Sequence, residues 1–259
     1  MRMMKKVLGT VTVLALSVSL LAGCGSTAVS PVSSTASTAA ESTTSSVVSE
    51  TTSAAADENA AAAAQLLNDL TGSYQELWPV ILADEYQQTW LDDCTALVGE
   101  ENAEAAFEKL SSMVTGDVYG EDAVEAYANG GGAYFCGFTN DLATLTFDGE
   151  TSTISGTDKD GNVLFSHTYH YIGMEPVRGL YEFESDDADS GEFTYFFLAP
   201  DTSAETYHIE FRYGSDADAL SQYDAGDYAY WLASGISTDC DQTMIDNCIK
   251  LFCTENLAG

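Results

Sequence analysis

Apolar residues recur at helical spacing in the first part of the chain downstream of residue 57. Leu66, Leu67 and Leu70 follow an alanine run and predict a helix over 58–70. The same spacing predicts helices over 74–82, 85–97, 101–114 and 122–127, and a glycine run at 130–132 ends the last of them. The segment 58–130 is therefore predicted to be helical.

From residue 133 onward the hydrophobic repeat shortens to two residues. Alternation predicts strands over 142–147, 151–155, 163–172, 180–184, 193–198 and 206–213, with Asp148-Gly149 as a turn. Many short strands at close spacing favour an antiparallel barrel or sandwich within 133–233. An amphipathic helix is predicted within 238–257. The predicted fold class is mainly β, with flanking N-terminal helices and a C-terminal helix.

The first 23 residues have the pattern of a bacterial lipoprotein signal peptide. Arg2, Lys5 and Lys6 precede an apolar run from Val7 to Leu21 that is short for a membrane span. The sequence Leu-Ala-Gly before Cys24 predicts cleavage before this cysteine and attachment of lipid to its thiol. The alternatives are an ordinary secretory signal or an uncleaved anchor. We expect the protein at the extracytoplasmic face of the cell membrane, held there only by its lipid.

A segment of low complexity follows the predicted lipidation site. Residues 26–57 are almost all Ser, Thr and Ala, without aromatic residues or periodicity. Such a segment cannot bury enough apolar surface to fold, so 24–57 is predicted to be a flexible tether. The folded domain is then 58–259, a size typical of one domain.

The charge balance limits the classes of partner. The chain has 8 Lys and Arg against 41 Asp and Glu, a formal net charge of −33. A chain this acidic repels phosphate backbones and anionic lipid headgroups, which excludes a nucleic-acid binder and a basic membrane-binding surface. With 45% hydrophobic residues it is nevertheless too apolar for a disordered acidic chain. The same acidity attracts divalent cations.

A series of short motifs follows in order along the chain: Glu76–Pro79, Gly137–Asp141, Tyr169–Gly173, Arg178–Glu184, Thr206–Ile209, Tyr213–Asp216 and Ala219–Leu220. In type and order these motifs resemble the ZinT (YodA-like) family of secreted zinc-binding proteins. The resemblance covers roughly residues 70–250. It implies a lipocalin-like (calycin) barrel, Zn²⁺ as the bound metal, a role in metal buffering or delivery, and a metal importer as a partner.

The sequence departs from this family at the zinc ligands. The resemblance implies three histidines, but two of these positions hold Phe196 and Thr206, and only His208 remains. His208 shares one face of its strand with Glu210, and Glu182 is a further candidate by its strand position. We therefore take His208, Glu210 and Glu182 as the candidate metal ligands. In the alternative interpretation, Glu210 forms an ion pair with Arg212.

The other two histidines are weaker candidates. His167 and His170 are three positions apart on one predicted strand, so they point to opposite faces and cannot both bind one ion. We expect both to be polar strand residues, although one of them is also a candidate replacement for a lost zinc ligand.

Five cysteines follow Cys24: Cys94, Cys136, Cys240, Cys248 and Cys253. In an exported protein they are candidates for disulfides, and we expect them to tie the terminal helix to the barrel. The pairing remains open, and an odd number leaves at least one thiol free or intermolecular. No two of them form a C-x-x-C motif, which argues against a redox motif or zinc knuckle.

No catalytic motif is present, so we expect no enzyme activity. The sequence lacks G-x-S-x-G, a P-loop and H-E-x-x-H. The leading hypothesis is a lipid-anchored extracytoplasmic protein that binds a metal ion. The rival hypothesis is that the metal site is lost and the barrel binds a small apolar ligand or a surface partner.

Overall fold

The structure, a computed structural model, describes residues 58–200 and 205–258. The predicted signal peptide (1–23), the predicted lipidation site Cys24 and the predicted tether (24–57) lie outside the described residues. Within the described ranges, no helix has the length and apolar character needed to cross a membrane.

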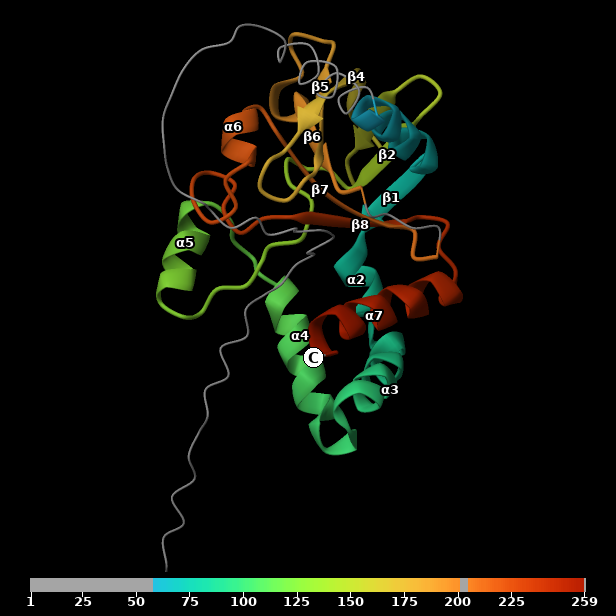
Figure 1. Cartoon of the computed structure of the whole chain (residues 1–259), viewed down its shortest axis with the longest axis vertical. Helices are drawn as coiled ribbons and strands as arrows, with labels where there is room; N and C mark the ends of the chain where they lie inside the picture. Colours follow the sequence, from blue (N-terminus) through green and yellow to red (C-terminus); the bar gives the residue numbers. More distant parts are fainter. Residues whose placement is uncertain (1–57, 201–204, 259) are drawn as a thin grey trace, which may run out of the picture. The chain divides into compact units, whose positions relative to one another are not determined.

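Eight strands of the described chain form a closed antiparallel barrel in sequential order (Figure 1). They are β1 (Gly72–Glu76), β2 (Thr144–Asp148), β3 (Thr153–Thr157), β4 (Val163–Met174), β5 (Tyr181–Ser185), β6 (Tyr195–Leu198), β7 (His208–Gly214) and β8 (Ala233–Ser237). Each strand pairs with the next along the chain, and β1 pairs with β8. A mainly β barrel with flanking helices is therefore confirmed.

The first and last strands of the barrel, β1 and β8, differ from the sequence prediction. The predicted helix over 74–82 begins as a strand, β1, and only Leu77–Ile81 is helical (α2). Tyr74 is the one buried residue of β1, and its ring packs edge-on against Phe147 at 5.7 Å. The barrel is thus not confined to 133–233, because it takes β1 from the predicted helical segment and extends through β8 to residue 237.

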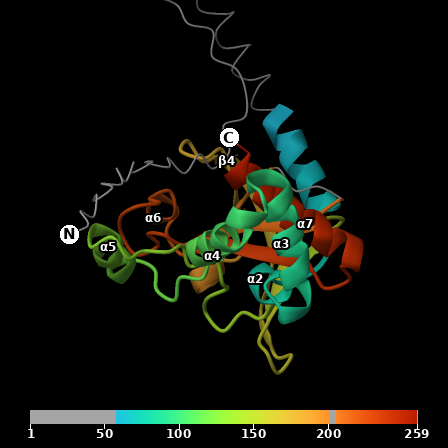
Figure 2. The same ribbon diagram turned by 90° about the horizontal axis from the view of Figure 1, so that it is seen from below.

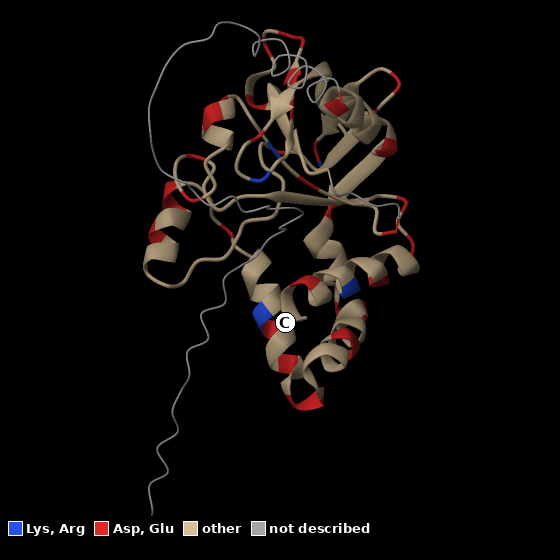
Figure 3. Ribbon diagram, viewed as in Figure 1, with Lys and Arg blue, Asp and Glu red and all other residues tan. Residues whose placement is uncertain are grey.

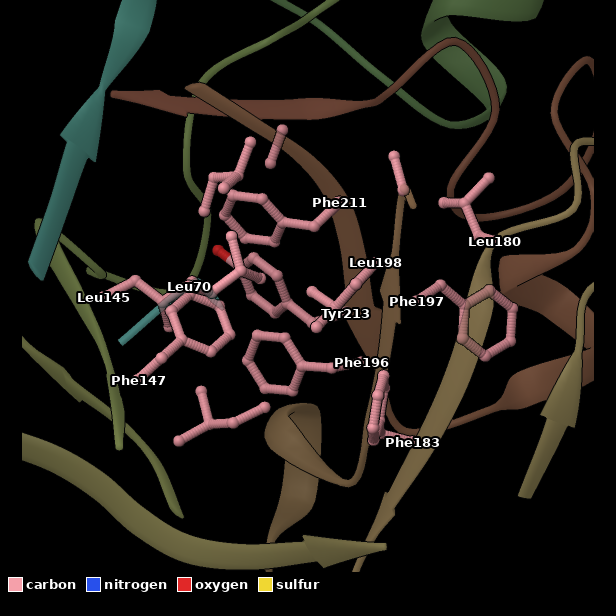
Figure 4. Close-up of a cluster of buried hydrophobic side chains, with 14 of the residues drawn as sticks. Leu70, Leu145, Phe147, Leu180, Phe183, Phe196, Phe197, Leu198, Phe211 and Tyr213 are labelled. Carbon is pink, nitrogen blue, oxygen red and sulfur yellow. The ribbon is translucent and has the colours of Figure 1, made fainter. Parts of the chain in front are cut away.

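Aromatic side chains fill the barrel interior (Figure 4). Phe147, Phe196, Phe211 and Tyr213 are all at most 2% exposed. Leu66 and Leu67 of the helix over 58–69, and Leu70 just after its end, belong to the same core. A filled interior argues against the rival hypothesis of an apolar ligand inside the barrel.

Helices form a second layer against the outer face of the barrel (Figure 2). The layer consists of α2, α3 (Gln87–Val98), α4 (Ala103–Val114) and α7 (Gln242–Leu257). Their apolar faces form a second core, to which β8 contributes Ile236. Two further helices, α5 (Glu121–Ala128) and α6 (Ala217–Leu220), and 3₁₀ turns at Asp84–Tyr86, Glu100–Asn102 and Gly191–Phe193 complete the described elements.

Acidic residues are spread over the loops and helices, and few basic residues lie among them (Figure 3). Two of the basic residues, Arg178 and Arg212, lie against the same tyrosine ring. The guanidinium groups of Arg178 and Arg212 lie 4.3 and 4.4 Å from the centre of the Tyr223 ring. These two arginines therefore help to pack the loop that carries Tyr223 against the barrel.

The buried Tyr213 side chain holds the main chain of the half-buried Thr139, and loss of its hydroxyl is expected to destabilise the fold. Its oxygen accepts a hydrogen bond from Thr139 N (2.6 Å) and donates one to Thr139 O (2.8 Å). Tyr213→Phe leaves that amide without its acceptor, so we expect the free energy of unfolding in urea to fall by about 1–3 kcal/mol. The matched control Tyr195→Phe removes a half-buried contact with Glu184 and is expected to change it by less than about 0.5 kcal/mol. Equal losses in the two variants would contradict this role.

Candidate functional site

A small cavity lies where β7 meets α2 and α7, outside the barrel interior. Its volume is about 30 Å³, enough for one water molecule or ion. Apolar residues of α2 and α7 form much of its wall, and His208, Glu210, Cys248 and Glu255 contribute the groups that can bind a metal. The complete lining is Leu77, Trp78, Ile81, His208, Glu210, Cys248, Leu251, Phe252 and Glu255.

The two-residue repeat of β7 places His208 and Glu210 on one face of the strand. Ile209 lies between them and Phe211 follows Glu210, and both apolar side chains are buried in the barrel core. Because side chains alternate along a strand, His208 and Glu210 point outward. The structure therefore brings together two of the three predicted ligands.

Arg212, the next outward residue of β7, is bound by main-chain oxygens. Its guanidinium donates to the carbonyls of Leu220, Gln222 and Tyr228. Burial lowers the pKa of Arg212 to about 10, and the side chain is fully enclosed. These main-chain carbonyls are different partners from the Glu210 carboxylate of the alternative interpretation.

The His208 ring is oriented by a threonine on the same chain segment. Thr206 Oγ1 lies 2.6 Å from His208 Nδ1. When Nδ1 carries the proton and donates to this hydroxyl, Nε2 presents a lone pair that can bind a metal ion. Thr206 occupies a position at which the family resemblance implies a histidine, so here it supports a ligand instead of supplying one.

Helix α7 brings a second carboxylate to the cavity. Cys248, Phe252 and Glu255 follow one another at intervals of four and three residues, so they share a face of the helix. The Asp241 side chain caps the helix by accepting from Met244 N at 3.0 Å. The sequence prediction missed Glu255. The signal that could have found it is an acidic residue at the end of the apolar face of the predicted helix.

The Cys248 thiol stays protonated and is the weakest donor of the set. It donates to Thr206 O at 3.2 Å, and burial raises its pKa to about 12. A protonated thiol is a poor metal ligand, because zinc binds the thiolate. One imidazole and two carboxylates remain as the donors of this cavity.

These donor types fit a divalent cation, but they do not form a finished coordination site. Zinc takes nitrogen and oxygen ligands at about 2.0–2.2 Å. Among the residues that the structure describes, no three His, Cys, Asp or Glu side chains lie close enough together to hold an ion. Binding at this cavity therefore requires side-chain movement.

The third predicted ligand, Glu182, lies elsewhere on the barrel. It is on β5 and pairs with Phe197 of β6, which in turn pairs with Arg212 of β7. Glu182 is therefore two strands away from β7 and does not line the cavity. Its pKa is raised by burial and by the nearby charges of Glu175 and Asp218.

The two other histidines are held by neighbouring loop aspartates. His167 Nδ1 lies 2.7 Å from Asp187 Oδ2, and His170 Nδ1 lies 2.7 Å from Asp186 Oδ1. They occupy opposite faces of β4. Neither lines the cavity, so neither replaces a lost zinc ligand there.

Phe196, at the other position where the resemblance implies a histidine, is fully buried in the barrel interior. His208 faces the opposite side of the barrel wall. These two positions cannot supply ligands to one ion here.

A larger cavity of about 340 Å³ shares Trp78 with the first. Its wall is mostly apolar, and its acidic group, Glu76, already accepts a hydrogen bond from Phe138 N at 2.6 Å. It contains no histidine, so the donors for a cation are concentrated at the small cavity.

Comparison with known proteins found similarity at the level of three-dimensional structure. No family model matches the sequence, and no curated protein matches it. The Zn(II)-bound ZinT-like domain of Streptococcus pneumoniae AdcA is 15% identical, with a TM-score of 0.44 over 70% of this chain and 87% of that chain. Zn(II)-bound AdcA from Streptococcus pneumoniae is 13% identical, with a TM-score of 0.41 over 71% of this chain and 34% of that chain. This chain therefore spans about a third of the whole AdcA chain.

The protonation of Cys248 predicts its reactivity. With the protein reduced at pH 8, we expect iodoacetamide to modify the half-buried Cys240 well before the buried Cys248, whose pKa of about 12 leaves little thiolate. Time-resolved peptide mass spectrometry measures both rates, and denaturant should equalise them. Equal rates in the native protein would contradict a protonated, enclosed Cys248.

Proposed function

We propose that this protein binds a divalent cation, with zinc as the expected metal, at the cavity between β7 and α7. His208, Glu210 and Glu255 are the proposed ligands. The observation that carries the proposal is that one imidazole and two carboxylates, from two separate elements, line one cavity of the size of an ion. Imidazole and carboxylate are ligands that zinc accepts.

The surroundings support a cation at this place. Thr206 Oγ1 lies 2.6 Å from Nδ1 of His208, so Nε2 is the ring atom that a metal would bind. The chain carries a formal net charge of −33, which raises the concentration of cations near its surface. A bound metal ion would bring no reaction of its own here, since the role is to hold and release the ion.

The departure from a three-histidine site lowers the expected affinity. A neutral imidazole and two carboxylates must approach one another before they share an ion, and that ordering costs free energy. We expect a reversible site suited to buffering or delivery.

We further propose that the protein acts outside the cytoplasm, attached to the cell membrane through lipid on Cys24. The support is the signal-like segment and the small residues before this cysteine. A metal importer in the same membrane is the proposed partner that would receive the ion.

Calorimetric titration with Zn²⁺ tests the metal site. We expect one saturable site in the full chain at physiological salt. His208→Ala and Glu255→Gln each remove a proposed ligand. Loss of a residue that only hydrogen-bonds a metal ligand already weakens binding by roughly tenfold or more, so we expect at least this loss in each variant.

The matched control is Glu182→Gln, which removes the same charge as Glu255→Gln but lies two strands from β7. It should leave the affinity unchanged. If both glutamate variants lose the same affinity, binding is a general effect of acidic charge. If the parent protein shows no saturable binding, the proposed site is wrong.

Labelling with a fatty-acid analogue tests the anchor. The parent chain, expressed in a bacterium that processes lipoproteins, should incorporate the label and remain with the membrane fraction. Cys24→Ala removes the thiol that accepts the lipid, so it should incorporate none. Equal labelling of the two chains would refute lipidation at Cys24.

A further inference from the structure

Two cysteine side chains meet in the second core, away from the proposed metal site. Cys94 lies on α3 and Cys253 on α7, and their sulfur atoms are 3.9 Å apart. Both side chains are fully buried. A disulfide has a sulfur–sulfur distance of about 2.05 Å, so a shift of roughly 2 Å separates this contact from a covalent bond.

The two helices are held in this arrangement by large side chains beside the cysteines. Trp90, one turn before Cys94 on α3, packs edge-on against Phe252 of α7 with ring centres 6.0 Å apart. The Trp90 ring nitrogen also donates to Ile81 O at 2.7 Å. The meeting of the two sulfurs is therefore part of a packed helix interface.

The other three described cysteines have different neighbours. Cys248 donates to Thr206 O, and Cys136 contacts the Tyr134 carbonyl at 4.0 Å. Cys240 lies before α7 and is only half-buried. Within the described ranges, Cys94 and Cys253 form the one pair whose sulfurs are in contact.

We propose that Cys94 and Cys253 form a disulfide in the exported protein, tying α3 to α7. The bond joins two helices, so it differs from the helix-to-barrel link expected from the sequence. In the described structure all five of these cysteines are free thiols, which is the reduced state of the proposed pair.

The oxidant is a disulfide of the thiol-oxidase or glutathione class. One cysteine thiolate attacks a sulfur of the oxidant's disulfide and expels an oxidant thiolate. The second cysteine thiolate then attacks the mixed disulfide and expels the other. The two protein thiols lose two protons and two electrons, and the oxidant takes them up as two thiols.

Burial determines when the bond forms. Burial raises the pKa of both thiols, and neither side chain reaches solvent in the folded protein. Oxidation should therefore occur during folding, before the helices close, and the finished bond should resist reductants. This makes the pair a permanent link and not a reversible switch.

The position of the link in the chain gives it a large effect. Strands β2 to β8 all lie between Cys94 and Cys253 in the sequence. A cross-link that encloses so much of the barrel restricts the unfolded chain strongly, which favours the folded state.

Oxidative refolding tests this pairing. The full chain carrying Cys24→Ala is refolded with a reduced and oxidised glutathione couple, then alkylated and digested without reduction. We expect one cross-linked peptide pair containing Cys94 and Cys253, and three alkylated cysteines of the five. Five alkylated cysteines, or a cross-link between any other two, would overturn the proposal.

Thermal unfolding provides a second readout with a matched control. Reduction should lower the midpoint of the parent protein by roughly 5–15 °C. Cys94→Ala and Cys253→Ala should each abolish the difference between oxidised and reduced samples, whereas Cys240→Ala should retain it. A difference that survives in Cys94→Ala would overturn the proposal, even if that variant is less stable overall.

Discussion

Closure of the barrel through the β1–β8 ladder is the constraint on which the rest of this structure depends. Tyr74 pairs with Ser237 and Glu76 with Gly235, so the eight described strands leave no free edge. In a closed barrel every strand must alternate between inside and outside. Aromatic rings fill the inside, and polar side chains of the same strands are forced outward.

This alternation places the candidate site outside the barrel. With Ile209 and Phe211 fixed in the interior, His208 and Glu210 face the helical layer. The same layer packs against β8 and holds α7, which carries Glu255 to the cavity. A cation site at this cavity would therefore depend on the interface between barrel and helices.

Periodicity predicted the elements that have one buried face, and it failed where that condition does not hold. In β8 four of five residues are buried, because the barrel interior covers one face and the helices cover the other, so no alternation appears. In β1 the single buried Tyr74 joins the apolar residues of α2 into a run that mimics a helix. At the site, the two-residue repeat placed His208 and Glu210 together. Whether Glu255 and Glu182 lie at the site depends on which helices and strands are neighbours of β7 in space. The sequence alone does not specify these neighbours.

The position of a bound zinc ion tests the proposed site most directly. Crystals grown with Zn²⁺, measured on both sides of the zinc absorption edge, locate bound zinc by its anomalous signal. If zinc binds at the cavity, the peak lies between His208, Glu210 and Glu255. A peak confined to surface carboxylates such as Asp186 beside His170, or no peak at all, would contradict the proposed site.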